Sequence, residues 1–353
     1  MDNRNFKEKF VEDVRRELFY QKGRRDVDIT IHQVDKLNES YDAMTVRSEG
    51  SVIGVSFNLE YYIGAYEDGV DYQKVVERAV ADIEEHIDQV PEVNVAFIYD
   101  YKFAKEKLSI EVVSAERNAH VLENVPHKMM EDLAIVYRIN VIDGGTVLVN
   151  NGLLDLYGIS PEQLHMDAVK SAPIIKPVVL KGINQVLTEM MSPEEKQSMD
   201  LDAMDLDEMM YVATVPDKIK GAGVLGYDTF LDDAARKLGG DFFILPSSVH
   251  EILLIKDDGE ASYVELEHMV KEVNATEVSE DEKLTDNVYH YDSKNKVFEL
   301  GENYEKRRKL EKILEKGSVL KDLQEKQASA AEQAAGLSHG EKKVSRNLGG
   351  EER

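Results

Sequence analysis

The chain changes its hydrophobic period near the N-terminus, and this change restricts the folds open to it. In FKEKFVEDVRRELFYQ, large apolar side chains recur every four residues, at Phe6, Phe10, Val14 and Leu18. This spacing places them on one face of a helix. In VDITIHQV, which follows, Val27, Ile29 and Ile31 alternate with polar residues, as in a strand with one buried face. The two patterns in succession indicate an α+β fold.

The same mixture of patterns continues to about residue 115. TVRS and SVIGVSFNLEYYIGAY predict further strands around a turn at Glu49 and Gly50. DYQKVVERAVADIEEHIDQ predicts a helix that has Asp71 as its N-cap and ends before Pro91. NVAFIYDY fits a helix or a strand, and KLSIEVVSAE fits a strand. We therefore expect a first α+β lobe over residues 1–115.

A second α+β lobe is expected over residues 116–300, with small antiparallel or mixed sheets like the first. Strands are predicted in LAIVYRINV, TVLVN, MYVATV, DFFILP and EILLIKDD, and a hairpin in NVYHYDSKNKVFEL. Helices are predicted in YDTFLDDAARKLG, in SYVELEHMVKEVNAT and in SPEQLHMDAVKSA, where Ser160 is the N-cap and Pro161 the first helical residue. KPVVLKGINQVLTEMM fits a helix or an irregular connection, and it leads into an acidic loop near residues 192–208.

The tail from Gly301 to Arg353 differs from the rest of the chain in charge. It carries 12 Lys or Arg and 10 Asp or Glu, whereas the whole chain has a net charge of -26, so the residues before it hold -28. NYEKRRKLEKILEKGSVLKDLQEKQ predicts a helix interrupted at Gly317, with the basic stretch KRRK near its start. The residues after it contain too few large apolar side chains to fold alone. We expect a helical and then disordered tail.

Composition excludes several functional classes. The chain has 353 residues and no cysteine, so disulfides, thiolate zinc sites and cysteine nucleophiles are absent. Its negative charge repels phosphates and anionic lipids, which argues against general nucleic-acid binding by the body and against a membrane-surface role. The N-terminal segment has no apolar signal region, and no run of apolar residues approaches the length of a membrane span. We expect a cytoplasmic protein, and the sequence does not indicate its oligomeric state.

GAGVLG, at residues 221–226, matches the glycine spacing of a dinucleotide-binding turn. That turn requires its first glycine directly after a strand. Here the strand MYVATV ends at Val215, and PDKIK intervenes before Gly221. The acidic residue Asp241 stands at the start of the next strand rather than at its end. We interpret the stretch as a turn that begins a helix, in which Ala222 and Gly223 allow close packing, and we predict no cofactor.

PSSVHE, at residues 246–251, offers four candidate catalytic side chains between two apolar strands: Ser247, Ser248, His250 and Glu251. A hydroxyl beside an imidazole that is oriented by a carboxylate suits nucleophilic catalysis. Glu251 follows His250 directly and points to the other face of a strand, so the orienting acid would come from Asp241 or from Asp257 and Asp258. The alternative is a structural turn. We favour that alternative and expect a partly buried His250 without a nucleophile–base pair.

Metal ligation receives little support from the sequence. None of the nine histidines forms H-x-x-x-H or H-E-x-x-H. The acidic loop offers four carboxylates, at Asp200, Asp202, Asp205 and Asp207. This loop lacks the central Gly and closing Glu of a calcium-binding loop. We predict a solvated loop and no metal site.

Several segments together resemble a known family. LAIVYRINV, MYVATV, GGDFFILPSSVHEILLIKDD and VNATEVSEDEKLTDNVYHYDSKNKVFEL are similar to a domain-of-unknown-function family of Firmicutes, numbered 5688, from gut clostridia and mobile elements. The resemblance runs from residue 1 to about 300, and FILPSSVHE and LTDNVYHYDS are its most specific parts. It implies no activity and no catalytic residues. Relatives often carry alanine at Gly223 and Gly226, and GSVLKDLQEKQ is similar to C-terminal elements of mobile-element proteins.

Three functions remain open at the level of the sequence. The first is a non-enzymatic accessory protein of mobile-element context that binds another protein, with its charged tail as a tether. The second is an acidic inhibitor that mimics nucleic acid, which the dispersed distribution of the acidic residues disfavours. The third is a hydrolase-type enzyme at PSSVHE. We favour the first.

Overall fold

The computed structural model describes residues 3–51, 53–89, 95–141, 145–192, 208–246, 248–314 and 326. Some of the predictions above fall outside these ranges. They concern Ser247, most of the acidic loop with its four aspartates, and the tail beyond residue 314 except Lys326. Within the described residues, helices are combined with small antiparallel sheets, which confirms the α+β fold class.

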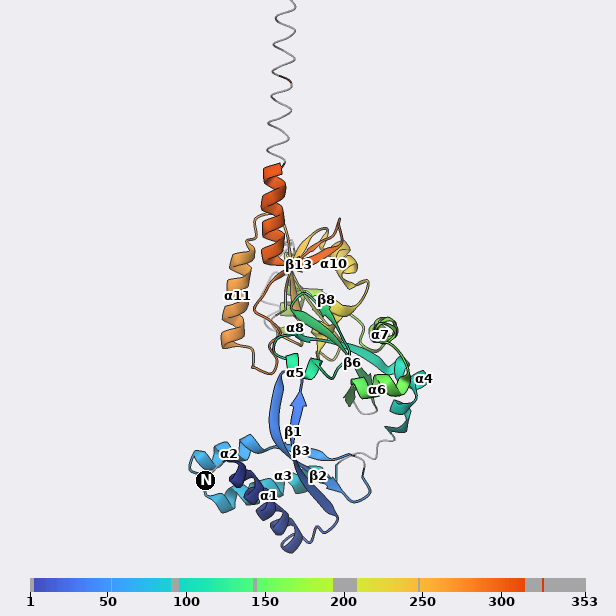
Figure 1. The fold of residues 1–353 in the computed structure, drawn as a ribbon. Coiled ribbons are helices and arrows are strands. Elements are labelled where there is room, and N and C mark those ends of the chain that lie inside the picture. The colour runs from blue at the N-terminus through green and yellow to red at the C-terminus, as the bar shows by residue number, and fades with distance from the viewer. Residues whose placement is uncertain are drawn as a thin grey trace, which may run out of the picture.

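The N-terminal unit packs three helices against a three-stranded antiparallel sheet of order β1-β2-β3 (Figure 1). Its elements are α1 (Asn3–Tyr20), β1 (Val27–Lys36), β2 (Glu39–Ser48), β3 (Val55–Asn58), α2 (Leu59–Glu67) and α3 (Tyr72–Ile87). The four apolar residues predicted to share one face of α1 are all buried, so that prediction is confirmed. The cap of α3 is also confirmed, because the side chain of Asp71 accepts hydrogen bonds from the backbone of Gln73 and Lys74.

One strand prediction in this unit is wrong. The stretch LEYYIGAY, which we expected to be extended, forms α2. The side chain of Asn58 accepts a hydrogen bond from the N–H of Glu60, and this cap starts the helix directly after the short strand β3. A continuous apolar run does not distinguish a buried strand from a helix, so this local cap decided the outcome.

The central elements form a sheet of order β4-β6-β5, with β7 also paired to β6, and surrounding short helices. In chain order they are η1 (Val95–Tyr99), α4 (Tyr101–Ala104), η2 (Lys105–Lys107), β4 (Leu108–Ser114), α5 (Ala119–Leu122), β5 (His127–Met130), β6 (Leu133–Asn140), β7 (Thr146–Leu148), α6 (Asn151–Tyr157) and α7 (Pro161–Ile175). The predicted cap of α7 is confirmed, because Ser160 Oγ accepts from the N–H of Gln163.

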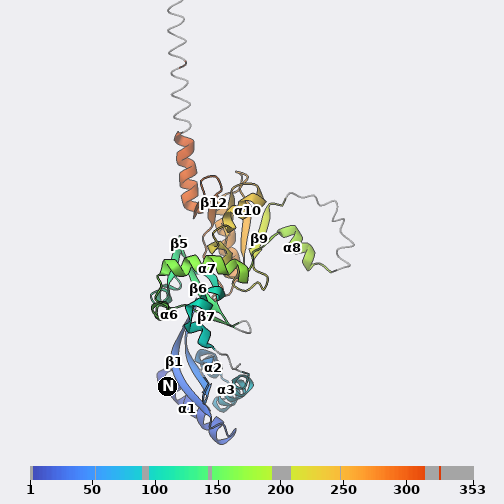
Figure 2. The same ribbon diagram turned by 90° about the vertical axis from the view of Figure 1, so that its right-hand side faces the viewer.

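The remaining elements build a larger antiparallel sheet of order β13-β12-β10-β11-β9-β8. They are β8 (Val179–Gly182), α8 (Ile183–Met190), β9 (Met210–Thr214), η5 (Gly221–Gly226), α10 (Phe230–Leu238), β10 (Phe242–Leu245), β11 (Ile252–Lys256), α11 (Tyr263–Thr276), β12 (Tyr289–Asp292) and β13 (Val297–Leu300). A C-terminal helix over residues 301–314 follows β13 and stands at the far end from the N-terminal unit (Figure 1). Helix α8 projects from the body (Figure 2).

The buried apolar side chains divide differently from the predicted lobes. One cluster lies between Phe6 and Ile87, and a larger one runs from Ile98 to Tyr291 through both of the other sheets. Strand β4, which we placed in the first lobe, pairs with β6 and contributes to the larger cluster. The boundary at residue 115 stays a prediction. The packing of β4 with the larger cluster supports a different proposed boundary, before Ile98.

The β1–β2 hairpin connects the N-terminal unit to the central sheet (Figure 1). At its tip, Leu37 is buried in a cluster with residues of β4, α5 and β6. Asn38 has a left-handed φ of 65°, and its N–H donates to Asn118 Oδ1 over 2.6 Å. Its side-chain amide donates to the carbonyl of Asp281 over 2.9 Å. One two-residue turn therefore contacts two distant segments of the chain.

Candidate functional site

The segments around PSSVHE and LTDNVYHYDS meet beside the hairpin tip. Ser248 and Lys283 form an antiparallel bridge, and the N–H of Val249 donates to the carbonyl of Glu282 over 2.9 Å. The Nε2 atom of His250 lies 3.2 Å from Oε1 of Glu282. The turn that we predicted between β10 and β11 is therefore held by a second segment about 30 residues further along the chain.

The imidazole of His250 is surrounded by backbone groups. Its Nδ1 lies 3.3 Å from the N–H of Lys220 and 3.1 Å from the carbonyl of Lys218, and it can use only one of the two at a time. Lys218 has a left-handed φ of 56° and Lys220 one of 59°, and these angles fold the backbone around the ring. The side chain of His250 is 34% exposed. His250 is therefore partly buried and is engaged in packing of the loops.

An ion pair of Lys220 also fixes this turn. Its ammonium group pairs with the carboxylate of Glu111, which is buried in β4 and also pairs with Arg138 of β6. A buried carboxylate is stable only when cations or donors surround it. The turn before η5 is thus anchored to the central sheet by charge and to His250 by backbone groups.

Ser248, the candidate nucleophile that the structure describes, makes no hydrogen bond to the imidazole of His250. Ser248 Oγ accepts a hydrogen bond from the backbone N–H of His250 over 3.1 Å, and no hydrogen bond joins it to the ring among the described residues. Glu251 is exposed. Asp241 accepts from Ser293, while Asp257 accepts from Tyr304. The carboxylate beside His250 is instead Glu282, which the sequence analysis missed because no local pattern links the two positions.

GAGVLG forms the 3-10 helix η5, and all six residues are buried. A Cβ on Gly221 would lie 2.2 Å from Thr214 Oγ1 and 2.3 Å from the carbonyl oxygen of His250. A Cβ on Gly223 would lie 2.4 Å from the carbonyl oxygen of Ile110. Close approach of the backbone accounts for both glycines. It was expected at Gly223 but not at Gly221. The helix that we expected to begin from this stretch starts later, because η5 ends at Gly226 and α10 begins at Phe230.

A cluster of polar side chains around Asp132 holds LTDNVYHYDS in place. The carboxylate of Asp132 accepts from Thr285 Oγ1 over 2.8 Å, from Asn287 Nδ2 over 3.0 Å and from the hydroxyl of Tyr289. Burial, and then the charge of Asp132, raise the pKa of the Tyr289 phenol far above its usual value. A hollow of about 390 Å³ lies beside this cluster and is lined by charges of both signs, among them Arg117, Lys283 and Glu116.

A comparison with known protein families shows the family of the chain. A family of unknown function, DUF5688, matches residues 4–293. The chain belongs to the DUF5688 family. The match covers the whole junction and ends before the C-terminal helix. No curated protein and no solved structure matches the chain.

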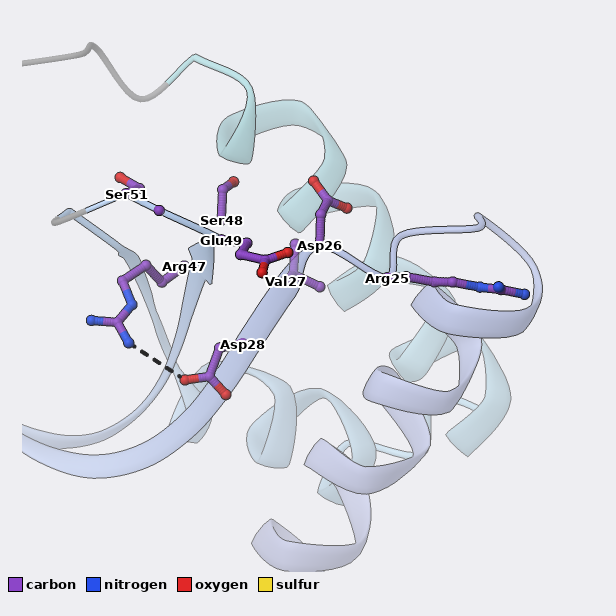
Figure 3. Close-up of a pocket in the computed structure, with 9 residues that line it drawn as sticks. Arg25, Asp26, Val27, Asp28, Arg47, Ser48, Glu49 and Ser51 are labelled. Carbon is purple, nitrogen blue, oxygen red and sulfur yellow. Dashed lines mark ion pairs between the residues drawn. The ribbon is translucent and has the colours of Figure 1, made fainter.

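In this DUF5688 member, another hollow of about 540 Å³ lies at the end of the β1–β2 hairpin that is remote from its tip (Figure 3). Arg47 and Asp28 point toward each other there, with 3.7 Å between Nη2 and Oδ2, whereas Arg25 points away from the other side chains. Among the described residues, no group of three or more His, Asp or Glu side chains is placed to hold a metal ion. No helix of the described part is long and apolar enough to cross a membrane.

A more apolar groove lies between α7 and the segment that runs from η1 through α4 to η2, and the sequence analysis missed it. It comprises two hollows of about 390 and 510 Å³ that share Glu106. The residues that line it, which define the α4–α7 groove, are Phe97, Phe103, Lys105, Glu106, Lys107, Asn140, Val141, Asp167, Lys170, Ser171, Ile174 and Ile175. Ile174 is 83% exposed and Phe103 is 60% exposed. Large apolar side chains are thus presented to solvent beside a concave surface.

Proposed function

We propose that this DUF5688 member is a non-enzymatic accessory protein that binds another protein through the α4–α7 groove. The observation that carries the proposal is the exposure of Ile174 and Phe103 beside the two hollows. Tyr99, at the end of η1, is also 63% exposed. Clustered apolar surface next to a concavity is typical of binding sites, because covering it releases about 25 cal/mol per Å².

The contacts of PSSVHE favour this proposal over a hydrolase. The imidazole of His250 faces Glu282 and two backbone groups, and the hydroxyl of Ser248 faces a backbone N–H. Nucleophilic catalysis needs hydroxyl and imidazole in contact and an open site beside them. A cytoplasmic location and a mobile-element context are part of the same proposal. They are supported by composition and by the resemblance of the sequence.

A photo-crosslinking experiment in the organism that encodes the chain tests the proposal. Benzoylphenylalanine is placed at position 103, and in a matched variant at Val264, which is 56% exposed on α11. We expect a crosslinked protein from position 103 and none from position 264. Absence of a product from position 103, or equal products from both positions, would show that the groove is not a specific protein-binding surface.

A further inference from the structure

Building on the proposed function, we infer the class of partner: the α4–α7 groove binds a short acidic segment of another protein that carries at least two large apolar side chains. The two hollows would each receive one apolar side chain. The lysines that line the groove would receive the carboxylates. This assignment deepens the proposal above, because it specifies the chemistry of the partner as well as the surface.

The charge of the groove supports an acidic partner. Lys105, Lys107 and Lys170 line the groove and are exposed, and none of them has an ion-pair partner in the described part of the chain. The lining carries these three ammonium groups against two carboxylates, of Glu106 and Asp167, which gives a local net charge of +1 in a chain whose net charge is -26. A positive local charge beside an apolar surface favours a partner of negative charge.

The carboxylate of Asp167 offsets only part of the positive charge of these lysines, and its position is fixed by hydrogen bonds. Asp167 accepts from the Tyr101 hydroxyl over 2.7 Å and from Gln163 Nε2 over 2.9 Å. Burial raises its pKa, but these hydrogen bonds and the charges of nearby lysines outweigh burial and lower the pKa below its usual value. Its carboxylate is therefore held at the wall of the groove. Glu106 is the other acidic residue of the lining, and it is exposed.

A second copy of the chain fits the groove less well. The residues before the tail carry -28, so two such bodies repel each other at long range. A short segment brings only its local charge to the groove. Because exposed charges are screened by salt, binding of an acidic segment is expected to weaken as ionic strength rises.

The test uses the full chain and a displayed library of random 14-residue peptides. We expect the enriched peptides to combine Leu, Ile, Phe or Met with an excess of Asp and Glu. Synthetic copies are then titrated by fluorescence anisotropy. Affinity is expected to fall roughly tenfold for Ile174→Ser and by at least as much for the triple change of Lys105, Lys107 and Lys170 to Glu.

Two matched variants serve as controls. Val264→Ser removes an exposed apolar side chain from α11, which is 56% exposed against 83% for Ile174. Changing Lys74, Lys294 and Lys312 to Glu adds the same negative charge at exposed sites away from the groove. Both should bind like the unchanged chain, and circular dichroism should show that all variants are folded. Gel filtration over a range of concentrations identifies self-association.

Three results would overturn the inference. They are failure to enrich any peptide, enrichment of peptides without an acidic excess, and equal affinity of the groove variants and the unchanged chain. Self-association that is abolished by Ile174→Ser would also overturn it in favour of a second copy. The crosslink at position 103 separates the two proposals. If it forms with a basic or neutral segment of a protein, the proposed function stands and the assignment of an acidic partner fails.

Discussion

The imidazole of His290 lies face to face with the phenol ring of Tyr304, with 3.5 Å between ring centroids and 9° between ring planes. Both side chains contact the same carboxylate oxygen, since Asp257 Oδ2 is 3.1 Å from His290 Nε2 and 2.6 Å from the Tyr304 hydroxyl. His290 is fully buried. Burial raises the pKa of Asp257, but the hydrogen bonds from His290 and Tyr304 outweigh it and hold that pKa far below its usual value. This contact fixes the C-terminal helix to the sheet.

Tyr304→Phe is expected to weaken that attachment. The change keeps the stacked ring but removes one donor from a buried carboxylate, which should lower the free energy of unfolding by about 1–3 kcal/mol. Urea unfolding measures the loss, and limited proteolysis should cut the 301–314 helix sooner. Tyr99→Phe, at an exposed ring, should change neither property. Equal behaviour of the two variants would contradict the role of the shared carboxylate.

Asp132→Asn should destabilise the junction. The carboxylate accepts from three side chains, and an amide supplies only one acceptor oxygen while placing an N–H₂ against donors. We expect a loss of about 2–3 kcal/mol in the free energy of unfolding. Asp155→Asn, at an exposed residue of α6, is the control and should leave the unfolding midpoint unchanged. A midpoint for Asp132→Asn that matches the control would argue against the polar cluster.

Gly221→Ala should be poorly tolerated. The added Cβ would lie 2.3 Å from a backbone oxygen, which cannot move aside as a flexible side chain can. We expect a loss of roughly 1–3 kcal/mol from overpacking. Gly240→Ala has open space around the new Cβ and should be close to neutral. Thermal unfolding of both variants gives the comparison, and a neutral Gly221→Ala would show that η5 shifts freely.

His165 should make stability depend on pH. Its Nε2 lies 3.0 Å from Lys128 Nζ, and its Nδ1 lies 3.0 Å from the Tyr137 hydroxyl. Burial, and then the Lys128 ammonium, lower the pKa of His165 below 6.5. As the pH falls, the unfolded chain therefore binds a proton at His165 before the folded chain does. The stability that neutral His165 contributes is complete above pH 6.5 and is lost as the pH falls through the folded pKa.

Urea unfolding between about pH 7.5 and pH 5.5 measures this effect. His165→Gln cannot titrate and should show a flatter decline of stability toward low pH. His268→Gln removes an exposed histidine from α11 and should keep the slope of the unchanged chain. If His165→Gln and the unchanged chain lose stability in parallel, His165 is not the group that responds.

Local signals in the sequence predicted local structure well. Asp71 and Ser160 cap the helices that they were expected to cap, and the turn between β10 and β11 lies where PSSVHE placed it. The partners of that turn could not be predicted in the same way. Glu282 reaches His250 only through the packing of a separate segment, and periodicity carries no information about such a contact. The exposure of Ile174 could not be predicted either, because an exposed apolar residue of a helix has the same sequence pattern as a core residue.

The hairpin tip also determines when the chain can complete its fold. Asn38 contacts the carbonyl of Asp281, 243 residues later in the chain. The ribosome releases the N-terminal unit first, and its own core, which ends at Ile87, can close without any later residue. The tip must then stay unpaired with Asp281 until nearly the whole body has been synthesised. Closure of this long loop is entropically costly and slow, so we expect the orientation of the N-terminal unit to be fixed last.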